Sequence, residues 1–163
     1  MYLLDTNVFI NAKSFYYQFD FHPGFWDWLL ISNSEGRVFS IREVYDEILK
    51  GEDKLVEWAR KNKNLFLDNS PDLVPHLRLI SEYVLQEGFN ANDIRDFISA
   101  ADYYLIGHAM AKSFKVVTHE VPRSKGAKIK IPQVCDKFDI ECMTPYKMLS
   151  LENPRFVLER EPE

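Results

Sequence analysis

The sequence predicts an α/β protein in which helices cover both faces of a central, mainly parallel sheet of four to five strands, a three-layer α/β/α arrangement. Two observations predict this class. Short apolar runs of strand length alternate along the chain with segments whose apolar residues have helical spacing. With 163 residues, 46% of them hydrophobic, the chain is also long enough for one core of its own. We therefore expect a single domain over residues 1–163, with a polar tail from about residue 155.

The expected strands are apolar runs bounded by polar or turn residues. The first closes on Asp5, which is followed by Thr6 and Asn7 before apolar residues resume. Open parallel sheets bind ligands at the carboxyl ends of their strands, so these three side chains are candidates for a site. The expected strands cover residues 1–5, 37–41, 64–68, 115–120 and 140–143.

Helices are expected between these strands, from the spacing of apolar residues and from signals at helix ends. Gly51 and Gly88 are expected to end the helices that precede them. Residues 89–99 mix helical and loop character. The expected helices cover residues 8–13, 25–31, 42–50, 53–62, 71–87, 100–113, 131–138 and 144–149.

Composition excludes several classes of protein. The net charge of -5 argues against a protein that coats nucleic acid through bulk positive charge, so any such contact must be local. Cys135 and Cys142 lack metal-site spacing, which argues against a disulfide framework or a structural zinc site. No apolar run approaches the roughly 20 residues that span a bilayer, and no signal peptide is recognisable, so we expect a cytoplasmic protein with no membrane contact.

Aromatic residues are concentrated between Phe15 and Trp28, around a turn at Pro23 and Gly24. Such a concentration is typical of core packing or of a partner-binding surface. A base-stacking platform is less favoured there, because no basic residues are interleaved with the rings. Residues 15–28 are therefore the candidate partner surface.

Four acids are expected to meet at one edge of the sheet. Asp5 and Glu120 close two strands that, if parallel neighbours, end at the same edge. Asp102 shares a helix face with apolar residues, and Glu47 borders the apolar face of the helix after the second strand. Unit charges about 4 Å apart repel by about 4 kcal/mol at an effective dielectric constant of about 20. A divalent cation such as Mg²⁺ or Mn²⁺ relieves that repulsion, so the acids are candidate metal ligands.

Each acid also has a purely structural interpretation. Asp5 or Thr6 can cap the following helix, and Asp102 can form a capping box with Ser99. Glu120 can be a turn residue. Glu47 can pair with Lys50, while Glu43 offers a competing, solvated acid.

Three short segments resemble the motifs of PIN-domain nucleases, the fold of VapC-type toxins. Residues 2–8 (YLLDTNV) are similar to the opening motif of that family. Residues 102–111 (DYYLIGHAMA) and 116–120 (VVTHE) resemble its D-x-x-I-A-x-A and L-V-T-x-D pair, and Glu47 falls where the family has an acid after its second strand. Glu120 stands where the family has Asp, and the chain is longer than a minimal PIN toxin, as expected for an uncharacterised branch.

The resemblance implies a Mg²⁺- or Mn²⁺-dependent endoribonuclease. Asp5, Asp102 and Glu120 would hold one or two ions, with Glu47 as a further ligand or as the base that positions water. RNA would be the substrate, an antitoxin protein a partner, and a homodimer the assembly. Supporting hydrogen bonds would come from Thr6, Asn7 and Thr118.

The segment after Glu120 has basic residues and no acid before Asp136. These residues could track phosphates or could simply be solvated, and the two interpretations stay open. Two further functions also stay open: a PIN-like scaffold without activity, and a metal phosphatase for small phosphate esters. The candidate substrate-binding residues are Arg123, Lys125, Lys128 and Lys130.

Overall fold

A computed structural model describes residues 1–122 and 128–157 of the chain. Strands and helices alternate in it as the sequence predicts. In chain order they are β1 (Tyr2–Leu4), α1 (Thr6–Asn11), η1 (Ala12–Tyr16, a π-helix), α2 (Pro23–Ser34), β2 (Val38–Ile41), α3 (Arg42–Ile48), α4 (Lys54–Lys61), η2 (Lys63–Leu65), β3 (Phe66–Leu67), η3 (Pro71–Leu73), α5 (Val74–Gln86), α6 (Ala91–Ser99), α7 (Ala101–Lys112), β4 (Lys115–Val117), α8 (Ile131–Lys137), β5 (Cys142–Met143) and α9 (Pro145–Glu152).

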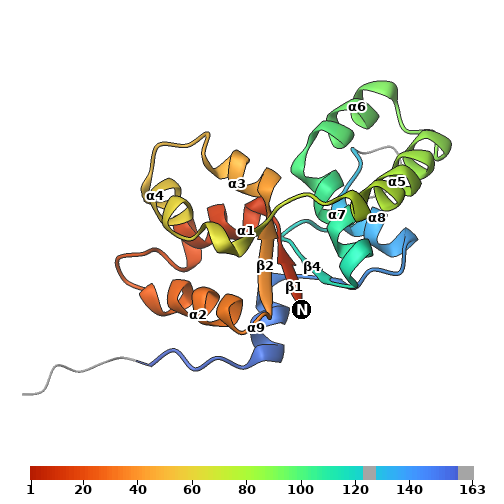
Figure 1. Cartoon of the computed structure of the whole chain (residues 1–163). Helices are drawn as coiled ribbons and strands as arrows, with labels where there is room; N and C mark the ends of the chain where they lie inside the picture. Colours follow the sequence, from red (N-terminus) through yellow and green to blue (C-terminus); the bar gives the residue numbers. More distant parts are fainter. Residues whose placement is uncertain (123–127, 158–163) are drawn as a thin grey trace, which may run out of the picture.

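The strands form one parallel sheet in the order β3-β2-β1-β4-β5. Strand β1 lies at its centre, with Leu3 paired to Phe39 of β2 on one side and to Val116 of β4 on the other. Helices cover both sides: Figure 1 shows α2 and α4 on one side of the sheet and α5, α7 and α8 on the other. The predicted three-layer α/β/α class with a parallel sheet is therefore confirmed.

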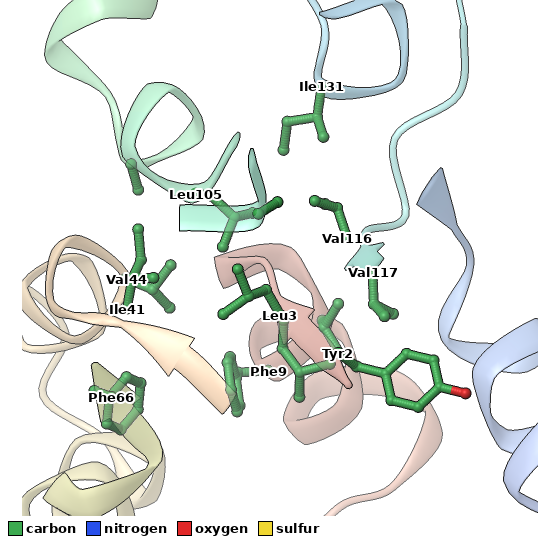
Figure 2. Packing of buried hydrophobic residues seen from close by; sticks show 14 of the residues in the cluster. Tyr2, Leu3, Phe9, Ile41, Val44, Phe66, Leu105, Val116, Val117 and Ile131 are labelled. Carbon is green, nitrogen blue, oxygen red and sulfur yellow. The ribbon is translucent and has the colours of Figure 1, made fainter. Parts of the chain in front are cut away.

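The core lies on both faces of the central strands. All three residues of β1 are buried, as are Val116 and Val117 of β4, whereas Lys115 at the start of β4 is partly exposed. Figure 2 shows Leu3 of β1 between Phe9 of α1 and Leu105 of α7, with Val116 of β4 beside Leu105. Each of these four side chains is at most 1% exposed. The core thus fixes the positions of the strands whose ends carry the candidate acids.

Several local expectations are corrected. The strand expected over residues 115–120 ends at Val117, so Glu120 lies in the following loop. Gly88 follows the C-cap residue of α5, Glu87, and has a positive φ of 78°, as a helix-ending glycine should, whereas α3 ends at Ile48, three residues before Gly51. Residues 91–99 form a complete helix, α6, because the Asn90 side chain accepts a hydrogen bond from the N–H of Asp93.

The strand order creates a switch point between β1 and β4. From β1 the chain moves outward to β2 and β3, then returns to the other side of β1 and continues to β5. Connections leave β1 and β4 in opposite directions, which opens a crevice at the carboxyl edge of the sheet. In Figure 1 this edge is at the end of β1 away from the N label. Among residues 1–122 and 128–157, no helix combines the length and apolar composition needed to cross a bilayer.

Candidate active site

Asp5 is a buried carboxylate at this switch point. It directly follows β1 and is only 5% exposed. Its Oδ2 accepts a 2.7 Å hydrogen bond from the hydroxyl of Thr118, at the end of β4. Burial, reinforced by the negative charge of Asp102, raises the pKa of Asp5 to about 7. Asp5 occupies the N-cap position of α1, but its side chain makes no capping hydrogen bond, so the capping interpretation is wrong for this residue.

Thr118 and Asn7 hold the ends of β1 and β4 together. The Asn7 amide Nδ2 donates to Thr118 Oγ1 at 3.0 Å, and its Oδ1 accepts from the N–H of His119 at 3.0 Å. The N–H of Glu120 donates to the same Thr118 oxygen at 3.0 Å. This network orients the Asp5 carboxylate and fixes the first turn of the loop after β4.

Thr118→Val should therefore destabilise the protein although it conserves volume. The substitution removes the donor to Asp5 and the acceptor for Asn7 and Glu120, leaving buried polar groups unpaired at a cost of about 2 kcal/mol. Urea unfolding at pH 5 measures this loss. Thr118→Ser keeps the hydroxyl and is the matched control; an equal loss in both variants would mean that the methyl group, rather than the network, is responsible.

Asp102 lies in the first turn of α7, where the helix passes over the switch point. Burial, with the negative charges of Glu120 and Glu47, raises the pKa of Asp102 to about 6. The predicted capping box is absent: Ala100 is the N-cap of α7, and the Ser99 hydroxyl donates to the carbonyl of Asp96. Asp102 is thus the second acid at this edge whose pKa is raised.

Glu47 reaches the same region from α3. One of its oxygens accepts a 2.5 Å hydrogen bond from the hydroxyl of Thr6, which directly follows Asp5. The other faces the N–H of Ala101, at 3.5 Å, at the start of α7. Glu47 therefore joins the ends of β1, α3 and α7. Its charge contributes to the raised pKa of Asp102, and among the described residues it forms no ion pair with Lys50, the alternative that its spacing also allows.

Glu120 is held by the start of α8. Its Oε1 forms an ion pair with Lys130, and its Oε2 accepts a 2.9 Å hydrogen bond from the N–H of Ile131. Its N–H donates to the Thr118 oxygen that binds Asp5, and its negative charge contributes to the raised pKa values of Asp5 and Asp102. Glu120 is thus a turn residue that caps a helix and also a member of the acid cluster.

The basic segment is only partly described. Arg123 and Lys125 lie outside the described residues. Lys128 is exposed, whereas Lys130 is engaged by Glu120 and is not a free phosphate ligand in this conformation. The sequence does not predict the ion pair between Lys130 and Glu120, because this pair depends on where α8 begins relative to the end of β4. A small cavity of about 160 Å³ connects these two lysines to Asp102; its lining is Asp93, Asp96, Phe97, Ala100, Asp102, Lys128, Ile129 and Lys130.

The donors fit a hard divalent cation. No three His, Cys, Asp or Glu side chains within residues 1–122 and 128–157 are grouped as a complete metal-binding set. Mg²⁺, however, typically takes only one or two carboxylates and keeps several waters. Asp5 and Asp102 meet that requirement, because burial and neighbouring negative charges, those of Asp102 and Glu120 for Asp5 and those of Glu120 and Glu47 for Asp102, raise the affinity of each carboxylate for a positive charge, here a proton. Glu120 joins them only if its ion pair with Lys130 opens.

The family described as a domain of unknown function (DUF4411) matches residues 2–156 of the chain. The chain belongs to this family. The DUF4411 match extends from β1 to the residues after α9, so it contains the whole sheet and all four acids. No curated protein and no solved structure matches the chain.

Proposed function

We propose that this DUF4411 protein is a metal-dependent endoribonuclease with a PIN-like active site. The observation that carries the proposal is the cluster of acids at the switch point of a parallel sheet: burial and the charge of Asp102 raise the pKa of Asp5, and burial with the charges of Glu120 and Glu47 raises the pKa of Asp102. Carboxylates that are close together and buried repel each other when ionised, and a bound cation removes that repulsion. The similarity of residues 2–8, 102–111 and 116–120 to PIN-domain motifs supports the same function.

Each acid has a distinct role in this proposal. Asp5 and Asp102 would hold Mg²⁺ or Mn²⁺, and Thr118 keeps Asp5 in its binding orientation. When bound, the cation neutralises charge on the attacked phosphodiester and makes water a better nucleophile. Glu47, which accepts a hydrogen bond from Thr6, would be a further ligand or the base that orients water and accepts its proton. Glu120 would complete the site when Lys130 releases it to bind a substrate phosphate.

RNA is the proposed substrate, and the cytoplasm is the proposed location. Exposed Lys128 supplies positive charge near Asp102 across the small cavity, although the protein as a whole is acidic. By the same resemblance, we propose a toxin role, with an antitoxin that covers the acidic edge, and a homodimer as the assembly. A small reading frame that overlaps this one upstream would support the antitoxin.

A specific contact favours a second candidate, a PIN-like scaffold without activity. Lys130 and the N–H of Ile131 occupy both oxygens of Glu120, so the third acid already has partners of its own. In an inactive protein this contact would be permanent, and the acids would serve only to orient a binding partner.

Incubation with single-stranded RNA in Mn²⁺ and in EDTA separates these functions, with p-nitrophenyl phosphate as a second substrate. We expect cleavage of RNA in Mn²⁺ alone and no turnover of the small ester. Asp102→Asn, purified in parallel, should be inactive. Equal cleavage by both preparations would reveal a contaminant, whereas turnover of the ester alone would identify a phosphatase.

A further inference from the structure

Three aromatic rings form a cluster beside the acids. The ring of Tyr16 stacks on that of His119, with centroids 5.8 Å apart and an interplanar angle of 24°. Tyr146 packs edge-on against both rings, at 5.5 Å from Tyr16 and 5.6 Å from His119. The cluster is not closed off as a core would be, because Tyr16 and Tyr146 remain 46% and 45% exposed. It therefore presents ring surface to solvent.

The topology explains why this cluster lies at the carboxyl edge. Tyr16 ends η1, in the connection that leaves β1. His119 follows β4 by two residues, and Tyr146 is in the first turn of α9, directly after β5. Three neighbouring strands of the sheet thus each contribute one ring beyond their carboxyl ends. These are the ends that also carry Asp5 and Glu120.

The position of His119 ties the cluster to the acids. Its N–H donates to Asn7, whose amide also binds Thr118, the partner of Asp5. Glu120 is the next residue, and adjacent Cα atoms lie about 3.8 Å apart. A ligand resting on the rings would therefore have its nearest phosphate within reach of the acid cluster.

We propose that Tyr16, His119 and Tyr146 form a stacking platform for an unpaired nucleobase next to the cleaved phosphodiester. This inference rests on the proposed function and narrows its substrate to single-stranded RNA or unpaired loops, since a paired base inside a duplex cannot present its face to a ring. Stacking on aromatic rings holds single strands without reading their sequence. The platform thus binds the base while the acids act on the phosphate.

A base explains the cluster better than a protein partner does. The stretch over residues 15–28 has no basic residues interleaved with its rings, so base stacking by this stretch alone is less favoured. The platform, however, takes only Tyr16 from that stretch, and its other rings come from segments that adjoin the acid site. Phe25 and Trp26, by contrast, are core residues, 0% and 2% exposed. A partner-binding surface made from residues 15–28 would not need His119 or Tyr146.

Binding of a fluorescently labelled single-stranded RNA octamer tests the platform, with Ca²⁺ in place of Mg²⁺ or Mn²⁺ to slow cleavage. Stacking of one base on an aromatic side chain corresponds to roughly 5- to 150-fold in affinity, so Tyr16→Leu and Tyr146→Leu should each weaken binding about 10-fold. Phe at either position should restore most of the affinity because it retains the ring. Phe21→Leu, which removes a 64% exposed ring outside the cluster, is the matched control.

An octamer of the same length with abasic sites distinguishes stacking from other effects. Tyr16→Leu and Tyr146→Leu should bind it as the unsubstituted protein does, because no base is left to stack. Three results would each overturn the platform. In the first, the Leu variants lose affinity equally for both octamers; in the second, all proteins bind the normal octamer with equal affinity; in the third, the unsubstituted protein does not bind RNA. The platform would also be overturned if the Leu substitutions changed the oligomer mass measured by light scattering and left RNA affinity unchanged. That result would identify the rings as a protein interface.

Binding and cleavage measurements distinguish an error in the stacking platform from an error in the proposed nuclease activity. Ring-dependent binding without RNA cleavage in Mn²⁺ would leave the platform standing and refute the nuclease. Cleavage that persists while ring removal leaves affinity unchanged would keep the nuclease and overturn the platform.

Discussion

Asp5→Asn is expected to lower the rate of Mn²⁺-dependent RNA cleavage about 1,000-fold and, in the same protein, to stabilise the metal-free fold at pH 8. The loss of rate follows because an amide is a much weaker ligand than a carboxylate, and a catalytic metal contributes several kcal/mol to the stabilisation of the transition state. Single-turnover cleavage of a labelled RNA measures it. Glu57→Gln, an exposed acid on α4, is the control and should retain the full rate.

The gain in stability follows from the sign of the pKa change. Because the pKa of Asp5 is about 7 in the fold and 3.8 in the unfolded chain, the native state binds more protons between these values. The free energy of unfolding should therefore fall as pH rises from about 4 to about 7, by roughly 4 kcal/mol if Asp5 acts alone. Asn cannot ionise, so Asp5→Asn should lose the part of the decline that Asp5 causes and keep the part, between about pH 4 and about pH 6, that the raised pKa of Asp102 causes.

Urea unfolding of both proteins in EDTA at pH 5 and pH 8 measures this effect. Asp5→Asn should be more stable than the unsubstituted protein at pH 8 by about 3 kcal/mol, and the difference should shrink at pH 5, where Asp5 is protonated. A destabilised Asp5→Asn at pH 8 would mean that Asp5 serves the fold rather than a site.

The fold was predictable because its main determinants are local. A short apolar run such as residues 1–5, closed by polar residues, has the length of a buried strand, and the helical spacing in residues 100–113 indicates which face of that helix points inward. The parallel arrangement follows from the alternation of strands and helices. The expected neighbours, β1 and β4, do pair through Leu3 and Val116.

Contacts that depend on returning loops were not predictable. Glu120 pairs with Lys130 across ten positions of sequence, and its bond to the N–H of Ile131 requires α8 to begin at a particular place. Periodicity carries no information about either contact. The aromatic cluster was missed for the same reason, since Tyr16 and Tyr146 meet only after the sheet has brought their strands together.

Mn²⁺ is expected to stabilise the protein strongly and in a pH-dependent way. A ligand at 100 times its dissociation constant raises the free energy of unfolding by about 2.7 kcal/mol. Protons compete for the same oxygens, so the gain should be large at pH 8 and small at pH 5, below the pKa values of Asp5 and Asp102, about 7 and about 6. Thermal unfolding with and without Mn²⁺ measures the gain, and an equal gain at both pH values would point to sites elsewhere on the acidic surface.

Calorimetric titration of Mn²⁺ at pH 8 tests the metal site most directly. The unsubstituted protein and Glu57→Gln should bind the ion with equal affinity, whereas Asp5→Asn and Asp102→Asn should each bind it at least 10-fold more weakly. Equal Mn²⁺ affinity in all four proteins, or no binding by any of them, would contradict a metal centre at the ends of β1 and β4.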